Sequence, residues 1–218
     1  MPIAKERILF EDQWLLAVSK LGGELVVQGK GKLQKLPLLD FLKKEYPTIH
    51  PVHRLDFETS GVVVFAKTRN TLSTIIEKKF EGWHKKYLAI VLGVPKEKKG
   101  VITIPLPARS GEGKVDAKTM YEVKESFNDL SIVECEIERG QRHQIRKHMS
   151  MIGHPLILDQ LYGNEKVNRA ISKYLKMQRF FLHAISVDFP HPQTGKPIHI
   201  ESPLPPVFER VIVLLKKS

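Results

Sequence analysis

Residues 51 to 68 read PVHRLDFETSGVVVFAKT, a charged tetrad followed by small polar residues and an apolar run. The run Val62–Ala66 is rich in β-branched and aromatic residues, which predicts a buried strand, and Thr59–Gly61 predicts a turn just before it. Arg54 and Asp56 are therefore expected on a loop held against a rigid strand, a placement typical of catalytic groups. Taken alone, these two residues would also fit a local ion pair or a turn-forming Asp.

The segments on either side predict short strands joined by turns, with helices between them. Strands or extended segments are expected at 8–20 (a hairpin around an acidic turn), 25–27, 62–67, 85–93, 101–107, 118–125, 130–139, 183–189 and 198–201. Helices are expected at 37–46, 70–80 with Asn70 as N-cap, 143–152, 167–177 and 205–215, and exposed loops at 29–32 and 109–118. Because hairpin-connected strands dominate and helices do not alternate regularly with them, the pattern predicts an α+β fold with a mainly antiparallel sheet.

The charge balance points to a polyanionic partner. Among 218 residues, 35 Lys and Arg stand against 24 Asp and Glu, a net charge of +11, while 42% hydrophobic content is that of a globular protein. A basic surface without a nucleic-acid partner remains the alternative on charge alone.

The single cysteine, Cys135, excludes an intrachain disulfide framework and a multi-cysteine zinc site. The first residues, MPIAKERILFEDQ, carry charges too early for a signal peptide, and no apolar run approaches the roughly 18 residues of a membrane span. We therefore expect a cytoplasmic protein.

A second basic stretch, Glu138–His148 (ERGQRHQIRKH), lies where a strand is expected to pass into a helix. Helix N-termini attract phosphate, and Arg side chains add bidentate contacts, so this is a candidate polyanion site. A solvated basic helix face would explain this segment equally well. A third segment, KKYLAIVLG, places Tyr87 within an apolar strand, where a core tyrosine with a satisfied hydroxyl is the ordinary interpretation.

Together, HRLDFETSGVVVFAKT, KKYLAIVLG and GQRHQIRKHMSMIGHPLILDQLYG occur in this order, and here the sequence closely resembles the RluA family of pseudouridine synthases. The resemblance extends from the hairpin around Trp14 to the strand at His183. It implies a central antiparallel sheet with flanking helices and an RNA-binding cleft. We expect residues 1–218 to form a single catalytic domain without a separate N-terminal RNA-binding domain, because Ile8 already belongs to the first hairpin.

The resemblance also implies roles for individual residues. Asp56 would be the catalytic nucleophile, Tyr87 would stack on the target uridine or abstract a proton from it, and Arg146 would pair with the Asp56 carboxylate. Arg54 would help to displace the target base from its stack. The further residues expected to contact RNA or assist base flipping are His53, Arg142, His143 and Gln144. No cofactor or metal is implied, because the isomerisation is redox-neutral. The expected partner is structured RNA, a ribosomal or transfer RNA stem-loop, and a monomer is the default.

Three positions depart from the family pattern. Leu21 follows Lys20 where proline is usual, Gln141 stands where arginine commonly follows the glycine, and Leu158 replaces a small residue before Asp159. Since the three implied active-site residues all match, we interpret these departures as changes in loop shape or RNA contact rather than loss of activity.

Other functional classes fit the sequence less well. The 9 histidines suggest a metal-dependent hydrolase, but His143 and His148 are five apart on an expected helix and no HExxH motif accompanies them. The fragments GKGK at Gly29 and GEGK at Gly111 lack the spacing of a phosphate-binding loop. A non-catalytic RNA-binding protein on the same fold is the more serious alternative. Between RNA substrates, we favour large-subunit ribosomal RNA over transfer RNA without a decisive motif.

Overall fold

The computed structural model describes residues 3–29, 36–108 and 111–217. By its internal contacts the chain forms two compact units. The first unit contains residues 1–84 and 184–203, and the second contains residues 85–183 and 204–218. The expectation of one catalytic domain stays a prediction, and each unit is described separately below.

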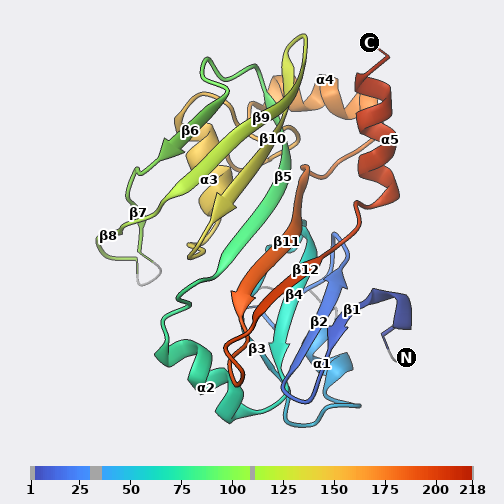
Figure 1. Cartoon of the computed structure of the whole chain (residues 1–218). Coiled ribbons are helices and arrows are strands. Elements are labelled where there is room, and N and C mark those ends of the chain that lie inside the picture. Colours follow the sequence, from blue (N-terminus) through green and yellow to red (C-terminus); the bar gives the residue numbers. More distant parts are fainter. Residues whose placement is uncertain (1–2, 30–35, 109–110, 218) are drawn as a thin grey trace. The chain divides into compact units, whose positions relative to one another are not determined.

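The first unit is a sheet with a short 3-10 helix and two α-helices (Figure 1). Its strands are ordered β1-β2-β4-β11, with β3 paired to β4 and β12 paired to β11. The pairs β1–β2, β2–β4, β3–β4 and β11–β12 are all antiparallel. The elements are η1 (Lys5–Arg7), β1 (Ile8–Glu11), β2 (Leu15–Lys20), α1 (Leu38–Leu42), β3 (His50–Pro51), β4 (Ser60–Ala66), α2 (Arg69–Glu77), β11 (Leu182–Pro190) and β12 (Pro197–Glu201).

The first hairpin confirms the sequence prediction. Asp12 closes its turn, because the carboxylate Oδ1 accepts hydrogen bonds from the backbone N–H groups of Trp14 (2.8 Å) and Leu15 (2.7 Å). β2 then runs antiparallel to β4, with Leu15 opposite Ala66 and Lys20 opposite Gly61. The antiparallel pairing of β2 with β4 thus places the end of β2 beside the start of β4.

Every residue of β4 is buried, which confirms the buried strand predicted from its apolar run. The predicted turn at Thr59–Gly61 is wrong at two of its positions, because Ser60 and Gly61 already belong to the strand. The core of this unit consists of Leu15, Ala17, Val52, Val62, Val64, Ala66, Ile75, Trp83, Val187, Phe189 and Ile200. The loop that precedes β4 is therefore attached to the most buried strand of its unit.

The second unit is a four-stranded antiparallel sheet in the order β5-β10-β9-β6, with a small hairpin and three helices. Its elements are β5 (His84–Leu92), β6 (Lys99–Ile102), β7 (Leu106–Pro107), β8 (Lys114–Val115), β9 (Thr119–Phe127), β10 (Leu130–Ile137), α3 (Gln144–Met151), α4 (Glu165–Leu175) and α5 (Pro206–Leu215). Alternating apolar and polar residues predicted the β9–β10 hairpin, and the structure confirms it.

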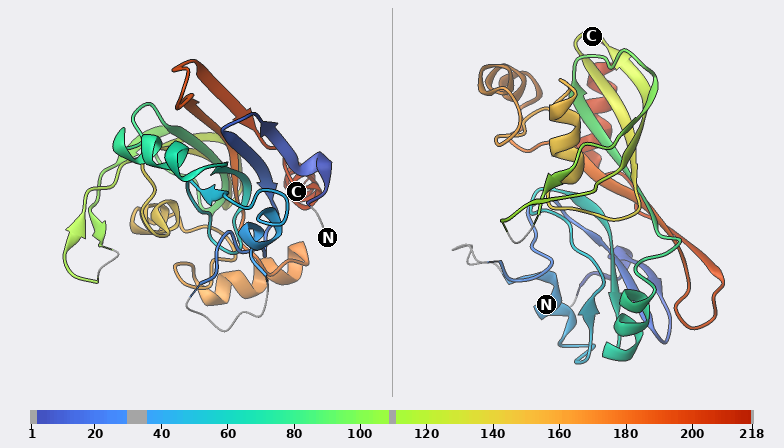
Figure 2. Two further views of the ribbon diagram at one scale, coloured as in Figure 1. Left: turned by 90° about the horizontal axis from the view of Figure 1, so that it is seen from below. Right: turned by 90° about the vertical axis from the view of Figure 1, so that its left-hand side faces the viewer.

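Helices complete the core of the second unit. α5 contributes Phe208, Val211 and Leu215 to the core, and α4 contributes Leu175. α3 lies against the sheet near β9 (Figure 2). α3 follows β10 after the segment 138–143, and its first turn is tied to the sheet because Gln144 Nε2 donates to the hydroxyl of Thr119 in β9 (3.1 Å).

Several predicted boundaries differ from the structure. The N-cap of α2 is Thr68, whose side chain accepts from the N–H of Thr71, and not Asn70. α1 is shorter than the helix predicted over 37–46, residues 25–27 form no strand, and the predicted loop over 109–118 contains β8. Residues 30–32 of the predicted 29–32 loop, and 109–110, lie outside the described residues.

The fold class, α+β with a mainly antiparallel sheet, is confirmed. In the described part of the chain, no helix is long and apolar enough to cross a membrane.

Candidate active site

The loop that carries Asp56 is anchored through its central residue. Leu55 is buried, whereas Arg54 on one side of it is exposed and Asp56 on the other is half-buried. The backbone carbonyl of Asp56 accepts from the N–H of Thr59 (3.2 Å), which closes a turn just before β4. Burial of Leu55 fixes the loop, so the two charged neighbours are held in place while their polar groups stay out of the core.

Lys20, the last residue of β2, supports the same loop. Its side chain is fully buried, and its ammonium Nζ donates to the carbonyls of Leu21 (3.0 Å), Phe57 (3.0 Å) and Thr59 (2.5 Å). A buried ammonium is tolerated only where hydrogen bonds replace its hydration. The bonds to Phe57 and Thr59 tie the segment after Asp56 to β2, a function of Lys20 that sequence reasoning missed.

His53 also connects the loop to β4. Its Nε2 accepts from the backbone N–H of Val64 (3.2 Å), so this ring nitrogen carries no hydrogen, and the ring lies edge-on to Trp83 with 6.3 Å between centroids. The described contacts give His53 a structural role, and its contact with RNA stays a prediction. The structure thus places His53, Arg54 and Asp56 on one loop, as the sequence predicted.

In the second unit, Tyr87 lies in the middle of β5, opposite Cys135 of β10, with 6% of its surface exposed. Lys85 is two residues earlier and therefore projects to the same face of the strand. Burial lowers the pKa of Lys85 to about 8, because the charged ammonium loses hydration. Tyr87 thus stands beside a lysine whose proton is unusually easy to remove.

Arg146 projects from α3 and is 4% exposed. Its guanidinium forms a bidentate ion pair with Asp159, Nε to Oδ2 at 2.6 Å and Nη2 to Oδ1 at 2.8 Å. Aromatic rings flank the guanidinium carbon, with Tyr162 at 5.1 Å and Phe180 at 4.4 Å from it to the ring centroids. The arginine is therefore fixed in plane and direction. Its pairing with Asp56 stays a prediction.

The junction before α3 has an unusual backbone. His143 is the N-cap residue and has a left-handed conformation (φ 55°), and its Nδ1 lies 2.9 Å from the hydroxyl of Tyr162. Arg142 is exposed. Gln144 is 3% exposed and is held at both ends of its amide: Oε1 accepts from the N–H of Gln141, and Nε2 donates to the Lys118 carbonyl. Its described contacts are internal, and RNA contact by these residues stays a prediction.

Sequence reasoning did not identify Asp159 as a functional residue. The acid stands in the run PLILDQL, where a single carboxylate among apolar residues is the one signal that an internal partner exists. It is completely buried, and its partner is 13 residues away, a separation for which no helix or strand period predicts a contact.

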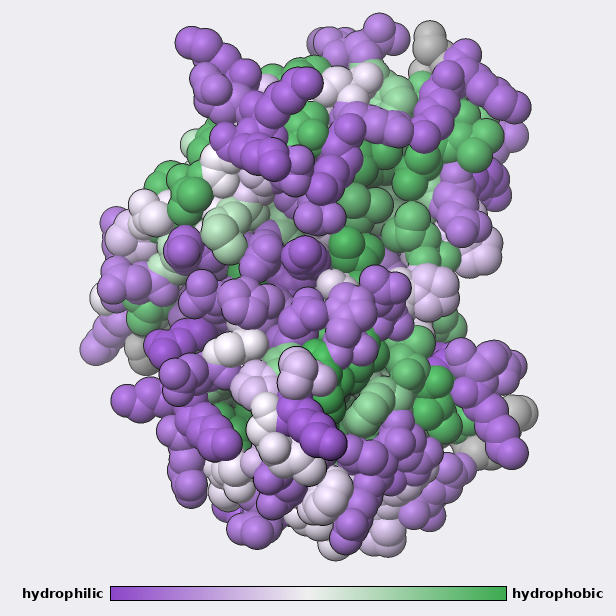
Figure 3. All heavy atoms as spheres, in the orientation of Figure 1, coloured by the Kyte–Doolittle hydropathy of each residue, from purple (hydrophilic) through white to green (hydrophobic). Residues whose placement is uncertain are grey.

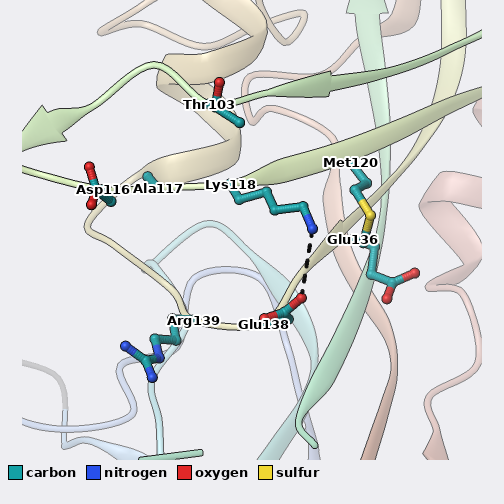
Figure 4. A pocket seen from close by; sticks show the side chains of 8 residues that line it. All are labelled: Thr103, Asp116, Ala117, Lys118, Met120, Glu136, Glu138 and Arg139. Carbon is teal, nitrogen blue, oxygen red and sulfur yellow. Dashed lines mark ion pairs between the residues drawn. The ribbon is translucent and has the colours of Figure 1, made fainter. Parts of the chain in front are cut away.

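The second unit also contains a pocket of about 340 Å³, which none of the candidate site residues lines (Figure 4). A long ion pair of 4.0 Å joins Lys118 to Glu138 across it. Its lining residues are Thr103, Asp116, Ala117, Lys118, Met120, Glu136, Glu138 and Arg139. Three carboxylates outnumber two cations, so this lining does not suit a phosphate. Within residues 3–29, 36–108 and 111–217, no three His, Cys, Asp or Glu side chains gather in a way that would hold a metal ion.

In each unit, the candidate residues therefore stand on rigid supports, the Asp56 loop beside β4 in the first unit and Arg146 on α3 in the second. Comparison with known proteins gives the class of protein. Residues 15–151 match the RNA pseudouridylate synthase family, and the chain belongs to that family. It is an isomerase that converts uridine to pseudouridine in RNA.

Relatives of known name cover almost the whole chain. The ribosomal large subunit pseudouridine synthase C of Pasteurella multocida is 33% identical over 98% of this chain and 69% of its own length. The protein of the same name from Escherichia coli is 33% identical over 97% of this chain and 70% of its own length.

Solved structures show the same fold. The structure of human RNA Pseudouridylate Synthase Domain Containing 4 matches with a TM-score of 0.79 at 24% identity, covering 97% of this chain and 93% of that one. Human RNA Pseudouridylate Synthase Domain Containing 1 matches with a TM-score of 0.73 at 21% identity, over 100% of this chain and 98% of that one.

Proposed function

We propose that the protein isomerises uridine in large-subunit ribosomal RNA, with Asp56 as the nucleophile, Tyr87 against the target base and Arg146 as the partner of the Asp56 carboxylate. The observation that carries the RNA assignment is the match of nearly the whole chain to relatives named for ribosomal large subunit pseudouridine synthesis. Transfer RNA is the second candidate substrate, and an experiment below separates the two.

The chemistry needs few groups. The N1–C1′ glycosidic bond breaks, the uracil turns, and a C5–C1′ bond forms; C5 loses its hydrogen as a proton and N1 gains one, so atoms and electrons balance without an external reductant. A carboxylate such as Asp56 supplies a nucleophile for the covalent step. A tyrosine such as Tyr87 offers a ring to stack on and a hydroxyl near the proton transfer at C5.

Arg54 is exposed on the same loop as Asp56, which supports the proposal that it helps to displace the base. A uridine stacked in RNA is unreachable, so an enzyme that modifies it extrudes the nucleotide and replaces part of the lost stacking. Hydrophilic side chains cover much of the face seen in Figure 3. With a net charge of +11, such a surface suits a phosphate backbone.

The nucleophile is tested by Asp56→Asn, which keeps the side-chain shape and removes the charge. We expect pseudouridine formation on protein-free large-subunit ribosomal RNA to fall by about 10⁴-fold or more, since a neutral amide cannot replace the covalent nucleophile. RNA affinity should change little. The matched control is Glu58→Gln, which makes the same chemical change two residues away on the same loop and should leave the rate within about threefold of wild type. Normal activity of Asp56→Asn would disprove the assignment.

The RNA substrate is identified by mapping pseudouridines across total RNA from cells with and without the gene. We expect sites lost only from large-subunit ribosomal RNA and restored by the wild-type protein, but not by Asp56→Asn. Loss confined to transfer RNA would replace ribosomal RNA by the second candidate.

A further inference from the structure

Asp159 forms a buried ion pair with Arg146, the arginine to which the proposed function gives a catalytic role. We propose that Asp159 is a positioning residue for uridine isomerisation, which acts through its buried ion pair with Arg146. This inference rests on the proposed function of Arg146 and adds a residue that the family comparison does not assign.

The pair has the geometry of a rigid orienting contact. Both carboxylate oxygens of Asp159 bind one edge of the guanidinium, Nε and Nη2, at 2.6 and 2.8 Å. The side chains are 4% and 1% exposed, so water does not compete for these bonds. A bidentate pair fixes both the plane and the direction of the guanidinium, whereas a single hydrogen bond would leave it free to rotate.

Asp159 is itself held on several sides. Its Oδ1 also accepts from the backbone N–H groups of Leu161 (2.9 Å) and Tyr162 (3.2 Å). Its backbone carbonyl accepts from Asn168 Nδ2 (2.9 Å) and from the N–H of Gly163 (3.0 Å). These bonds leave the carboxylate one position, and that position determines where Arg146 points.

Asn168 secures this turn from α4. Its Nδ2 donates to the Asp159 carbonyl, while its Oδ1 accepts from the N–H of Leu158 (2.8 Å), and the side chain is 4% exposed. One amide therefore spans the peptide that precedes Asp159. Removing it would loosen the position of Asp159 and leave every charge of the ion pair in place.

A purely stabilising role does not explain this arrangement well. Buried ion pairs contribute little net stability compared with well-packed apolar side chains, because both charges lose their hydration. What the pair provides is a fixed direction for a cation. A displacement of about 1 Å at a catalytic group is enough to cost about 100-fold in rate.

The first test is Asp159→Asn, assayed in single turnover on ribosomal RNA together with RNA binding. We expect the rate of pseudouridine formation to fall by about 100-fold, with the dissociation constant within about threefold of wild type. An equal loss of binding and rate, or no loss of rate, overturns the proposal. Asp159→Glu, which restores the charge one methylene further out, should recover part of the rate.

A double-mutant cycle tests whether Asp159 acts through the arginine. In an Arg146→Gln background, adding Asp159→Asn should change the residual rate by less than about twofold, because the positioned group is already absent. A further loss as large as that in the wild-type background would show that Asp159 acts independently of Arg146, and would overturn the proposal.

Asn168→Ala keeps the proposal testable if Asp159→Asn does not fold. We expect a fall of about 10-fold in single-turnover rate with unchanged RNA affinity. The matched control is Ser172→Ala on the same helix, which removes a hydrogen bond to the Met177 carbonyl and makes no contact with Asp159 in the described hydrogen bonds. If Asn168→Ala retains the wild-type rate, Asp159 needs no such support and the proposal fails.

The two hypotheses fail in different ways. A wild-type protein that forms no pseudouridine on any cellular RNA overturns the proposed function and this role with it. An active wild type beside an equally active Asp159→Asn overturns only the role of Asp159.

Discussion

Gly61 is a residue at which the structure leaves no room for a side chain. Its φ is +113°, and a Cβ placed there would lie 2.2 Å from the carbonyl oxygen and 2.6 Å from the nitrogen of Ala184, both backbone atoms. Neither neighbour can move aside as a flexible side chain would. The start of β4, on which the Asp56 loop depends, therefore requires glycine.

We predict that Gly61→Ala lowers the free energy of unfolding by about 2–5 kcal/mol, the sum of about 1–2 for the left-handed backbone and about 1–3 for overpacking. Urea titration measures this loss. Gly153→Ala is the matched control, because Gly153 has a similar φ of +87° but no atom within 4 Å of the added methyl group. It should lose only the backbone contribution, and equal losses in both variants would contradict the close approach to Ala184.

His148 gives the fold a dependence on pH. Its Nε2 must donate to the Ile104 carbonyl (2.9 Å), so Nδ1 accepts from the Thr119 hydroxyl (2.8 Å), which in turn accepts from Gln144 Nε2 (3.1 Å). Burial lowers the pKa of His148 below 6.5, against a smaller opposing effect of the Ile104 bond. Protonation would place a second donor against the hydroxyl.

Since the unfolded chain protonates His148 near pH 6.5 and the folded chain resists, unfolding takes up a proton below that pH. We predict that wild type loses stability as pH falls from 6.5 towards 5, by up to about 1.4 kcal/mol per pH unit relative to His148→Gln. Urea titrations at pH 7, 6 and 5 give the comparison. Parallel pH curves for the two proteins would show that His148 does not cause the dependence.

At the scale of elements, the end of β2 and the start of β4 act as one support for the Asp56 loop. Lys20 stands opposite Gly61 in the β2–β4 register, and its ammonium is the donor shared by the Leu21, Phe57 and Thr59 carbonyls. An apolar side chain of similar length would fill the same volume and supply no donor.

We predict that Lys20→Met lowers the free energy of unfolding by about 1–3 kcal/mol for each carbonyl left buried without a partner, and that the rate of pseudouridine formation falls with it. The Phe57 and Leu21 carbonyls keep second donors, the N–H groups of Gly23 (2.7 Å) and Glu24 (3.3 Å), so the Thr59 carbonyl should be the most affected. Lys20→Arg, which keeps the charge and the donors, should recover part of the loss. A Lys20→Met variant as stable and active as wild type would rule out this support.

Elements with a clear period were predictable from sequence, and elements defined by a distant neighbour were not. β9 and β10 alternate in polarity, so both strands and their turn follow from the residues alone. Ser60 and Gly61 read as a turn because both residues are common in turns. Both residues nevertheless belong to β4, in which Gly61 pairs with Lys20 of β2. Ala184, far along the chain, leaves no room at position 61 for a side chain.

The same distinction applies to the candidate site: its locally encoded loop was predictable from sequence, and its contact between distant residues was not. The loop with Arg54 and Asp56 followed from a polar segment before an apolar strand, whereas the Arg146–Asp159 pair depends on a turn that no local pattern encodes. Leu158 shows why: its φ is +63°, a conformation that a small residue adopts more easily, yet it is fully buried in the core of its unit. Burial of a leucine, about 1.5–3 kcal/mol, offsets about 1–2 kcal/mol of backbone strain, so the departure from the family pattern is tolerated.

For the whole molecule, the number of RNA phosphates that the protein contacts determines how RNA binding responds to salt. Each phosphate neutralised by the protein releases counterions, so the logarithm of the binding constant falls linearly with the logarithm of the salt concentration. Arg142 is exposed at the junction before α3 and is a proposed RNA contact. Arg169 is equally a surface arginine, but it is paired with Glu165 on α4 at 2.6 Å.

We predict that Arg142→Gln reduces the magnitude of the salt slope by about 0.7–0.9, the value for one phosphate contact, and weakens binding similarly for all RNA sequences. Arg169→Gln removes the same charge from the molecule and should leave the slope unchanged within about 0.2, because slopes count contacts rather than total charge. Binding isotherms at several salt concentrations, on a stem-loop and on an unrelated RNA, measure both. Equal reductions in the two variants would mean that the protein's overall field, and not the α3 junction, holds the RNA.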